Sequence, residues 1–72
     1  MDLKASIKRA TSLAREQGHD MVVGDDGSGA WVIMPLADPR SDALRPGFIV
    51  GPQGLRYPED HEQAVGLMAR GR

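Results

Sequence analysis

The sequence predicts a small α+β domain in which two helices pack on an antiparallel sheet of three or four strands, in the order α-ββ-ββ-α. Apolar residues recur at helical spacing near the start of the chain, and a second helical pattern closes it. Between them, two pairs of short apolar runs flank glycine-rich turns, which is typical of β-hairpins. With 72 residues, we expect the chain to form a single domain with one thin core in two layers.

The first helix is predicted over residues 3–17. Its apolar side chains recur at spacings of three and four, which gathers them on one face toward a core. That face consists of Leu3, Ile7, Ala10, Leu13 and Ala14. Asp2 is placed to cap the helix N-terminus, and Gly18 is placed to end the helix in a left-handed conformation.

A β-hairpin is predicted over residues 20–34, with the Gly- and Asp-rich stretch 24–29 as its turn. Its second strand, 30–34, carries an apolar side chain at every position and therefore on both faces. Such a strand is expected to be covered on both sides. The second cover can be the chain's own loop, a second copy of the chain or another protein.

Residues 35–47 form the longest predicted connection and carry three of the five prolines. Pro39 follows Asp38 and can open one helical turn that buries Leu44. The alternative for this segment is a surface loop. Long loops in compact domains are often functional, so the segment is also a candidate contact region.

A second, shorter hairpin is predicted over residues 48–57, around a Gly-Pro-Gln-Gly turn at residues 51–54. The last helix is predicted over residues 59–70, because Pro58 and the acidic residues after it suit a first helical turn. Its inner face is predicted to consist of His61, Ala64, Val65, Leu67 and Met68. The simplest architecture places both helices on one face of the sheet.

Composition narrows the class of protein. Apolar residues make up 40% of the chain and the net charge is −1, which favours a folded domain over disorder. The absence of cysteine excludes disulfides and thiolate metal sites, and favours a reducing, cytoplasmic environment. The N-terminal residues lack the apolar run of a signal peptide and no segment has the length of a membrane span, so we expect no membrane partner.

Charges are segregated along the chain. Residues 1–17 carry four cations and two anions, a net charge of +2, whereas residues 19–29 carry three aspartates without Lys or Arg, a net charge of −3. This pattern predicts a basic helix face and an acidic edge. It is more typical of a protein that complements a partner than of a nucleic-acid-binding protein, which usually has a clear basic excess.

Asp25 and Asp26 stand among glycines, as in some metal-binding and phosphate-binding loops. An EF-hand needs more oxygen ligands than follow here, and a phosphate loop of the Walker type needs a lysine that this run lacks. His19 and His61 have no further metal ligand at suitable spacing, and no serine has the sequence context of a nucleophile. We therefore expect no metal, no cofactor and no enzymatic activity.

Protein recognition is the function that the sequence favours, because sheet edges invite strand addition and strand 30–34 is apolar on both faces. The predicted partner-binding residues are the charges of the hairpin tip and of the proline-rich loop: Asp25, Asp26, Asp38, Arg40, Asp42 and Arg45. One alternative is a nucleic-acid-binding face on the first helix, made of Lys4, Lys8, Arg9 and Arg15. Another is a small homodimeric accessory subunit.

In size and class, the chain resembles the very small, cysteine-free α+β proteins that phages and other mobile elements encode, including anti-CRISPR inhibitors. The resemblance lies in architecture and covers no motif. It implies a stoichiometric inhibitor that blocks a larger host complex, with the acidic residues occupying a groove that otherwise holds nucleic acid.

Overall fold

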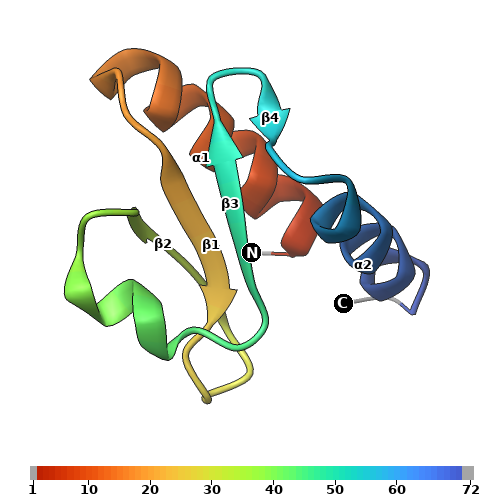
Figure 1. Cartoon of the computed structure of the whole chain (residues 1–72). Coiled ribbons are helices and arrows are strands. Elements are labelled where there is room, and N and C mark those ends of the chain that lie inside the picture. The colour runs from red at the N-terminus through yellow and green to blue at the C-terminus, as the bar shows by residue number, and fades with distance from the viewer. Residues whose placement is uncertain (1, 71–72) are drawn as a thin grey trace.

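Four antiparallel strands form one sheet, and two α-helices flank it (Figure 1). The computed structural model describes residues 2–70. Its elements are α1 (Leu3–Gln17), β1 (Met21–Asp25), β2 (Trp31–Pro35), the 3₁₀ helix η1 (Pro39–Ala43), β3 (Gly47–Gly51), β4 (Gly54–Leu55) and α2 (Pro58–Ala69). The predicted α+β class and the order of helices and strands are confirmed.

Helix α1 begins and ends where its capping residues predict. The Asp2 Oδ1 atom accepts a hydrogen bond from the Ala5 N–H at 2.7 Å, and Gly18 ends the helix with a φ of 73°. The apolar face packs on the sheet, with Ile7 and Leu13 at its margin. Ser6 is also fully buried in this face, and its hydroxyl donates to the Asp2 carbonyl oxygen at 2.9 Å.

The core lies between α1 and one face of the sheet. Leu3, Val23, Phe48 and Val50 are its largest fully buried side chains. The ring of Trp31 lies against that of Phe48, with 6.0 Å between centroids, and so ties the first hairpin to the core.

The strand order in the sheet is β2-β1-β3-β4. Both predicted hairpins are present, and they join because β1 pairs with β3 in antiparallel register. This leaves β2 as one edge strand of the sheet and the two-residue β4 as the other.

The first hairpin turn is shorter than predicted. Gly24 and Asp25 were expected to lie in the turn, but they belong to β1, where Gly24 pairs with Val32 and with Gly47. Gly24 is needed there because of a close approach rather than a reversal of the chain. A Cβ atom at this position would lie 2.6 Å from the Cβ of Leu44.

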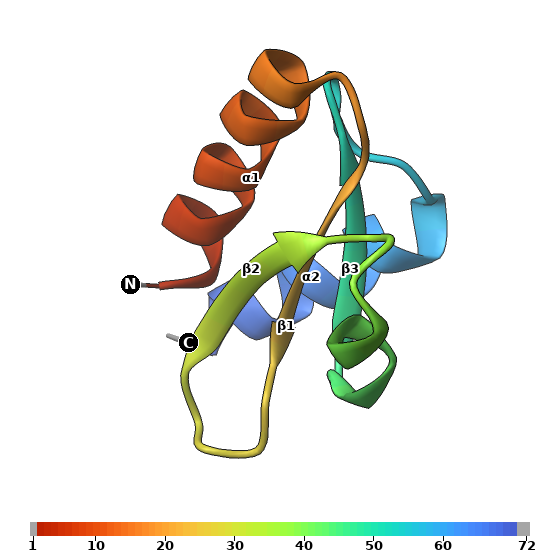
Figure 2. The same cartoon turned by 90° about the vertical axis from the view of Figure 1, so that its left-hand side faces the viewer.

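The connection between β2 and β3 crosses the face of the sheet opposite α1 (Figure 2). Asp38 caps η1 with its side chain, Pro39 is the first residue of η1, and Leu44 directly after it is only 2% exposed. Val22, on the central strand, is 4% exposed. The prediction of one helical turn that buries Leu44 is therefore confirmed, and the chain's own loop covers the centre of the second face.

Helix α2 lies at the β4 end of the sheet and packs on both α1 and β4 (Figure 1). Its inner face consists of Ala64, which is fully buried, and of the partly buried Leu67 and Met68. The prediction of His61 and Val65 on that face was wrong, because both are exposed. Helix α2 contacts the core through Ala64, Leu67 and Met68, so its apolar face is narrower than predicted.

Candidate functional site

A hollow lies between β2 and η1, on the face of the sheet opposite α1. Its volume is about 440 Å³, and its floor is apolar. The lining residues include Asp26, Val32, Met34, Arg40, Ala43 and Leu44. All five residues of β2 are half-buried, so η1 covers β1 but leaves the second face of β2 partly open.

The acidic tip of the first hairpin is built by its own carboxylates. The Asp25 Oδ1 atom accepts hydrogen bonds from the N–H groups of Gly27 at 2.8 Å and Gly29 at 3.2 Å. The Asp26 Oδ1 atom accepts from the Ser28 hydroxyl at 2.5 Å and from the Ser28 N–H at 3.0 Å. The side chain and then the backbone of Ser28 lower the pKa of Asp26, which keeps this carboxylate ionised.

These hydrogen bonds give the two aspartates a structural role in the turn. Within residues 2–70, no three side chains of the His, Cys, Asp or Glu type gather as metal ligands. The tip nevertheless keeps its negative charge at the surface, since Asp26 is exposed at the margin of the hollow.

The charges of the proline-rich loop divide into two groups. Arg40 lines the same hollow as Asp26 and forms an ion pair with Asp38 at 2.7 Å. The side chain and the backbone N–H of Arg40 lower the pKa of Asp38 to about 2. Asp42 and Arg45 instead line a second hollow of about 430 Å³ on the β3 side of η1.

The structure therefore brings together some of the predicted partner-binding residues and separates others. Asp26 and Arg40 meet at one hollow, Asp38 supports Arg40, and Asp25 lies at the adjoining tip. Asp42 and Arg45 belong to the neighbouring hollow.

The predicted nucleic-acid-binding residues of α1 are all exposed. One of them has a structural contact, because the Arg15 Nη2 atom donates to the Pro52 carbonyl oxygen at 3.0 Å and so fastens the β3–β4 turn to the helix. Lys4, Lys8 and Arg9 remain as candidates for a basic face.

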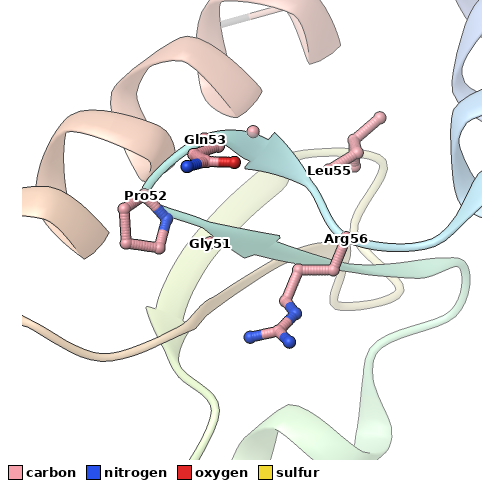
Figure 3. Close-up of a pocket in the computed structure, with 6 residues that line it drawn as sticks. Gly51, Pro52, Gln53, Leu55 and Arg56 are labelled. Atoms are coloured by element: carbon pink, nitrogen blue, oxygen red, sulfur yellow. The ribbon is translucent and has the colours of Figure 1, made fainter.

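A further hollow of about 370 Å³ lies at the β3–β4 turn, where residues 51–56 alone line it (Figure 3). Arg56 at its end forms an ion pair with Asp20 at 2.8 Å, which holds β4 to the start of β1. With a glycine-rich turn as its only wall, this hollow has no paired acid and base that could serve catalysis.

Sequence reasoning missed two features of this surface. The first is that Arg40 returns to the same hollow as Asp26, which depends on the path of residues 35–47 across the sheet. The second is Asp60, whose Oδ2 atom accepts a hydrogen bond from the Ile49 N–H of β3 at 3.4 Å. Gly24 could have indicated that residues 35–47 pass closely over the sheet, because a glycine within a strand often marks a close backbone approach.

Comparison with protein-family models, with curated proteins and with solved structures gave no match for this chain. No helix within residues 2–70 combines the length and apolar character needed to cross a membrane.

Proposed function

We propose that this chain is a non-enzymatic protein-binding module whose contact surface is the hollow between β2 and η1 together with the acidic tip. One observation carries the proposal: an exposed carboxylate, Asp26, and an exposed guanidinium, Arg40, stand at the margin of one hollow with an apolar floor. Apolar floors with polar margins are typical of protein contact surfaces.

The charges of this surface indicate what kind of partner suits it. The positive charge of Arg40 is already balanced by Asp38 at 2.7 Å, so Asp25 and Asp26 leave the margin with net negative charge. Opposite charges across an interface speed association and exclude wrong partners. A partner with apolar side chains beside a basic patch fits best, as on proteins that bind nucleic acid.

The proposed mode of action is stoichiometric blocking in the cytoplasm. A small chain that seats its acidic tip in a basic groove keeps nucleic acid out of that groove by occupying it. This mechanism is the one that the architectural resemblance to phage-encoded inhibitors implies. For this blocking mechanism, the chain needs a stable contact surface and not a catalytic centre.

The test is affinity capture of a partner from a native host extract, followed by binding measurements with a charge-neutral variant. Asp25→Asn with Asp26→Asn keeps the side-chain oxygens that accept hydrogen bonds in the turn and removes both charges. We expect about tenfold weaker binding and a smaller salt dependence.

The matched control is Glu59→Gln with Glu62→Gln, which removes two exposed charges from α2 and is expected to leave binding unchanged. Equal binding by the wild type and the Asp25/Asp26 variant would count against the acidic tip as the contact surface.

The alternative proposal is a nucleic-acid-binding module that uses α1, and the exposure of Lys4, Lys8 and Arg9 on one helix favours it. A salt-dependent gel shift tests it. Under this alternative, Lys4→Glu with Lys8→Glu abolishes the shift; a shift that survives both substitutions rules out the basic face of α1.

A further inference from the structure

The two edges of the sheet differ in how far they are protected. On the β4 side, β4 pairs with only the last residues of β3, and beyond it the Asp60 carboxylate accepts the hydrogen bond of the Ile49 N–H at 3.4 Å. On the other side, β2 has no neighbouring strand among residues 2–70 except β1. Natural sheets usually protect such an edge with charged side chains, and β2 carries none at its five positions.

The hydrogen-bond pattern shows which groups of β2 point outward. The Leu36 N–H donates to the Asp20 carbonyl oxygen at 3.1 Å, so residues 20 and 36 form a hydrogen-bonded pair. Such pairs alternate along an antiparallel ladder, so Val22 and Met34 form the next one. Val23 and Ile33 form a pair without hydrogen bonds between them, and the N–H and C=O groups of Ile33 therefore point away from β1.

A second hydrogen bond gives the same result independently. The Asp25 N–H donates to the Pro46 carbonyl oxygen at 3.2 Å, so the odd-numbered residues of β1 direct their N–H groups toward β3. Val23 therefore cannot pair with Ile33 through its backbone. The backbone N–H and C=O groups of Ile33 therefore lie on the outer side of β2.

Pro35 limits how far this edge extends. Proline has no N–H to donate, and the Pro35 carbonyl oxygen already accepts a hydrogen bond from the Asp38 N–H at 3.0 Å. Strand addition is therefore centred on Ile33 and ends at Pro35. An incoming strand has to be short, and it has to be apolar on both faces because β2 is.

We propose that this edge pairs with the same edge of a second copy of the chain, giving an antiparallel dimer with two-fold symmetry at Ile33. Each Ile33 N–H then donates to the partner's Ile33 carbonyl oxygen, and Val32 lies opposite the partner's Met34. A second β2 has the apolar faces that the edge requires. The antiparallel arrangement also sends the two acidic tips to opposite ends of the contact, and the net charge of −1 per chain opposes association only weakly.

The dimer leaves α1 on one side of a continuous sheet and brings the two β2–η1 hollows next to each other on the other side. The proposal is independent of the proposed partner contact. Self-association is measured on the isolated chain, whereas the partner contact is measured through the Asp25 and Asp26 charges.

The first experiment is sedimentation velocity of the wild type over a wide range of concentration, compared with a synthetic chain that carries N-methylation of the Ile33 amide. We expect the mass of the wild type to rise from one chain to two. N-methylation removes both reciprocal hydrogen bonds without touching the β1–β2 ladder, and is expected to weaken the dimer at least about tenfold. An unchanged circular dichroism spectrum shows that the fold is kept.

A charge-swap pair tests the register. A chain with Val32→Lys and Met34→Lys and a chain with Val32→Glu and Met34→Glu are each expected to stay monomeric, and their mixture is expected to form dimers. Val65→Lys, on the exposed side of α2, is the control that keeps self-association.

Three results would overturn the proposal. They are a wild type that stays monomeric at every concentration, an N-methylated chain that associates as tightly as the wild type, and a charge-swap mixture that does not associate. A wild type that stays monomeric but pairs its β2 edge with a strand of another protein also counts as the first result.

Discussion

At the scale of single residues, the fold depends on caps between near neighbours in the sequence and on the long-range contact between Gly24 and Leu44. The caps of Asp2 and Gly18 act over a few residues, so both could be predicted directly from the chain. The role of Gly24 was predicted wrongly, because it depends on Leu44, which reaches β1 only after the chain has crossed the sheet. The position of Asp26 and Arg40 at one hollow was also missed, because it depends on the path of residues 35–47 across the sheet.

The close approach at Gly24 gives a prediction about stability. In Gly24→Ala, the new methyl group meets the Leu44 Cβ at 2.6 Å and the Pro46 carbonyl oxygen at 2.8 Å, and neither atom belongs to the flexible end of a side chain. We expect a loss of about 1–3 kcal/mol in the free energy of unfolding, measured by urea denaturation.

Gly66→Ala is the matched control for this substitution. Gly66 lies within α2, and a Cβ atom there meets nothing within 4 Å. Alanine is expected to stabilise the protein by about 0.5–1 kcal/mol, since it has the higher helix propensity. If both variants unfold at the same urea concentration, the close contact at Gly24 is contradicted.

At the scale of elements, the helices and strands were predictable because each has its own periodicity, whereas the order of the strands was not. Two hairpins in sequence are compatible with several sheets, and the choice of β1 as the partner of β3 follows from packing over the whole core. The inner face of α2 was overestimated for a related reason. Periodicity shows which residues share a face, but the extent of burial depends on what that face meets.

The cover that η1 provides can be tested through its anchor. Leu44→Ala removes a side chain that is 2% exposed and opens space over β1, so we expect the free energy of unfolding to fall by about 2–5 kcal/mol. Leu36→Ala, at a residue that is 43% exposed in the same connection, is expected to cost about 1 kcal/mol or less. Equal losses in thermal or urea unfolding would mean that η1 does not rest on the sheet through Leu44.

At the scale of the whole molecule, protection is greatest at β1, which has a strand on either side and a cover on both faces. It decreases toward β2, whose five residues are all half-buried. A gradient of this kind is typical of small domains, in which edge elements open more readily than the centre.

Amide hydrogen exchange, followed by NMR at low protein concentration, tests this gradient together with the direction of the β2 backbone groups. The amides of Val32 and Met34 face β1 and are expected to exchange slowly, while the Ile33 amide between them exchanges fast. Under the dimer proposal, the Ile33 amide becomes slower as the concentration rises. Slow exchange of Ile33 in dilute solution would contradict the outward direction of its N–H group.

The hydrogen bond from the Ile49 N–H to Asp60 also has a consequence for growth into larger assemblies. A domain with two open edges can add copies without end and form filaments, as amyloid-forming chains do. Here the edge strand on the β4 side is only two residues long, and the Asp60 carboxylate engages the Ile49 N–H of β3 beside it. Under the dimer proposal, pairing uses the longer β2 edge of each copy, and we expect assembly to end at two chains.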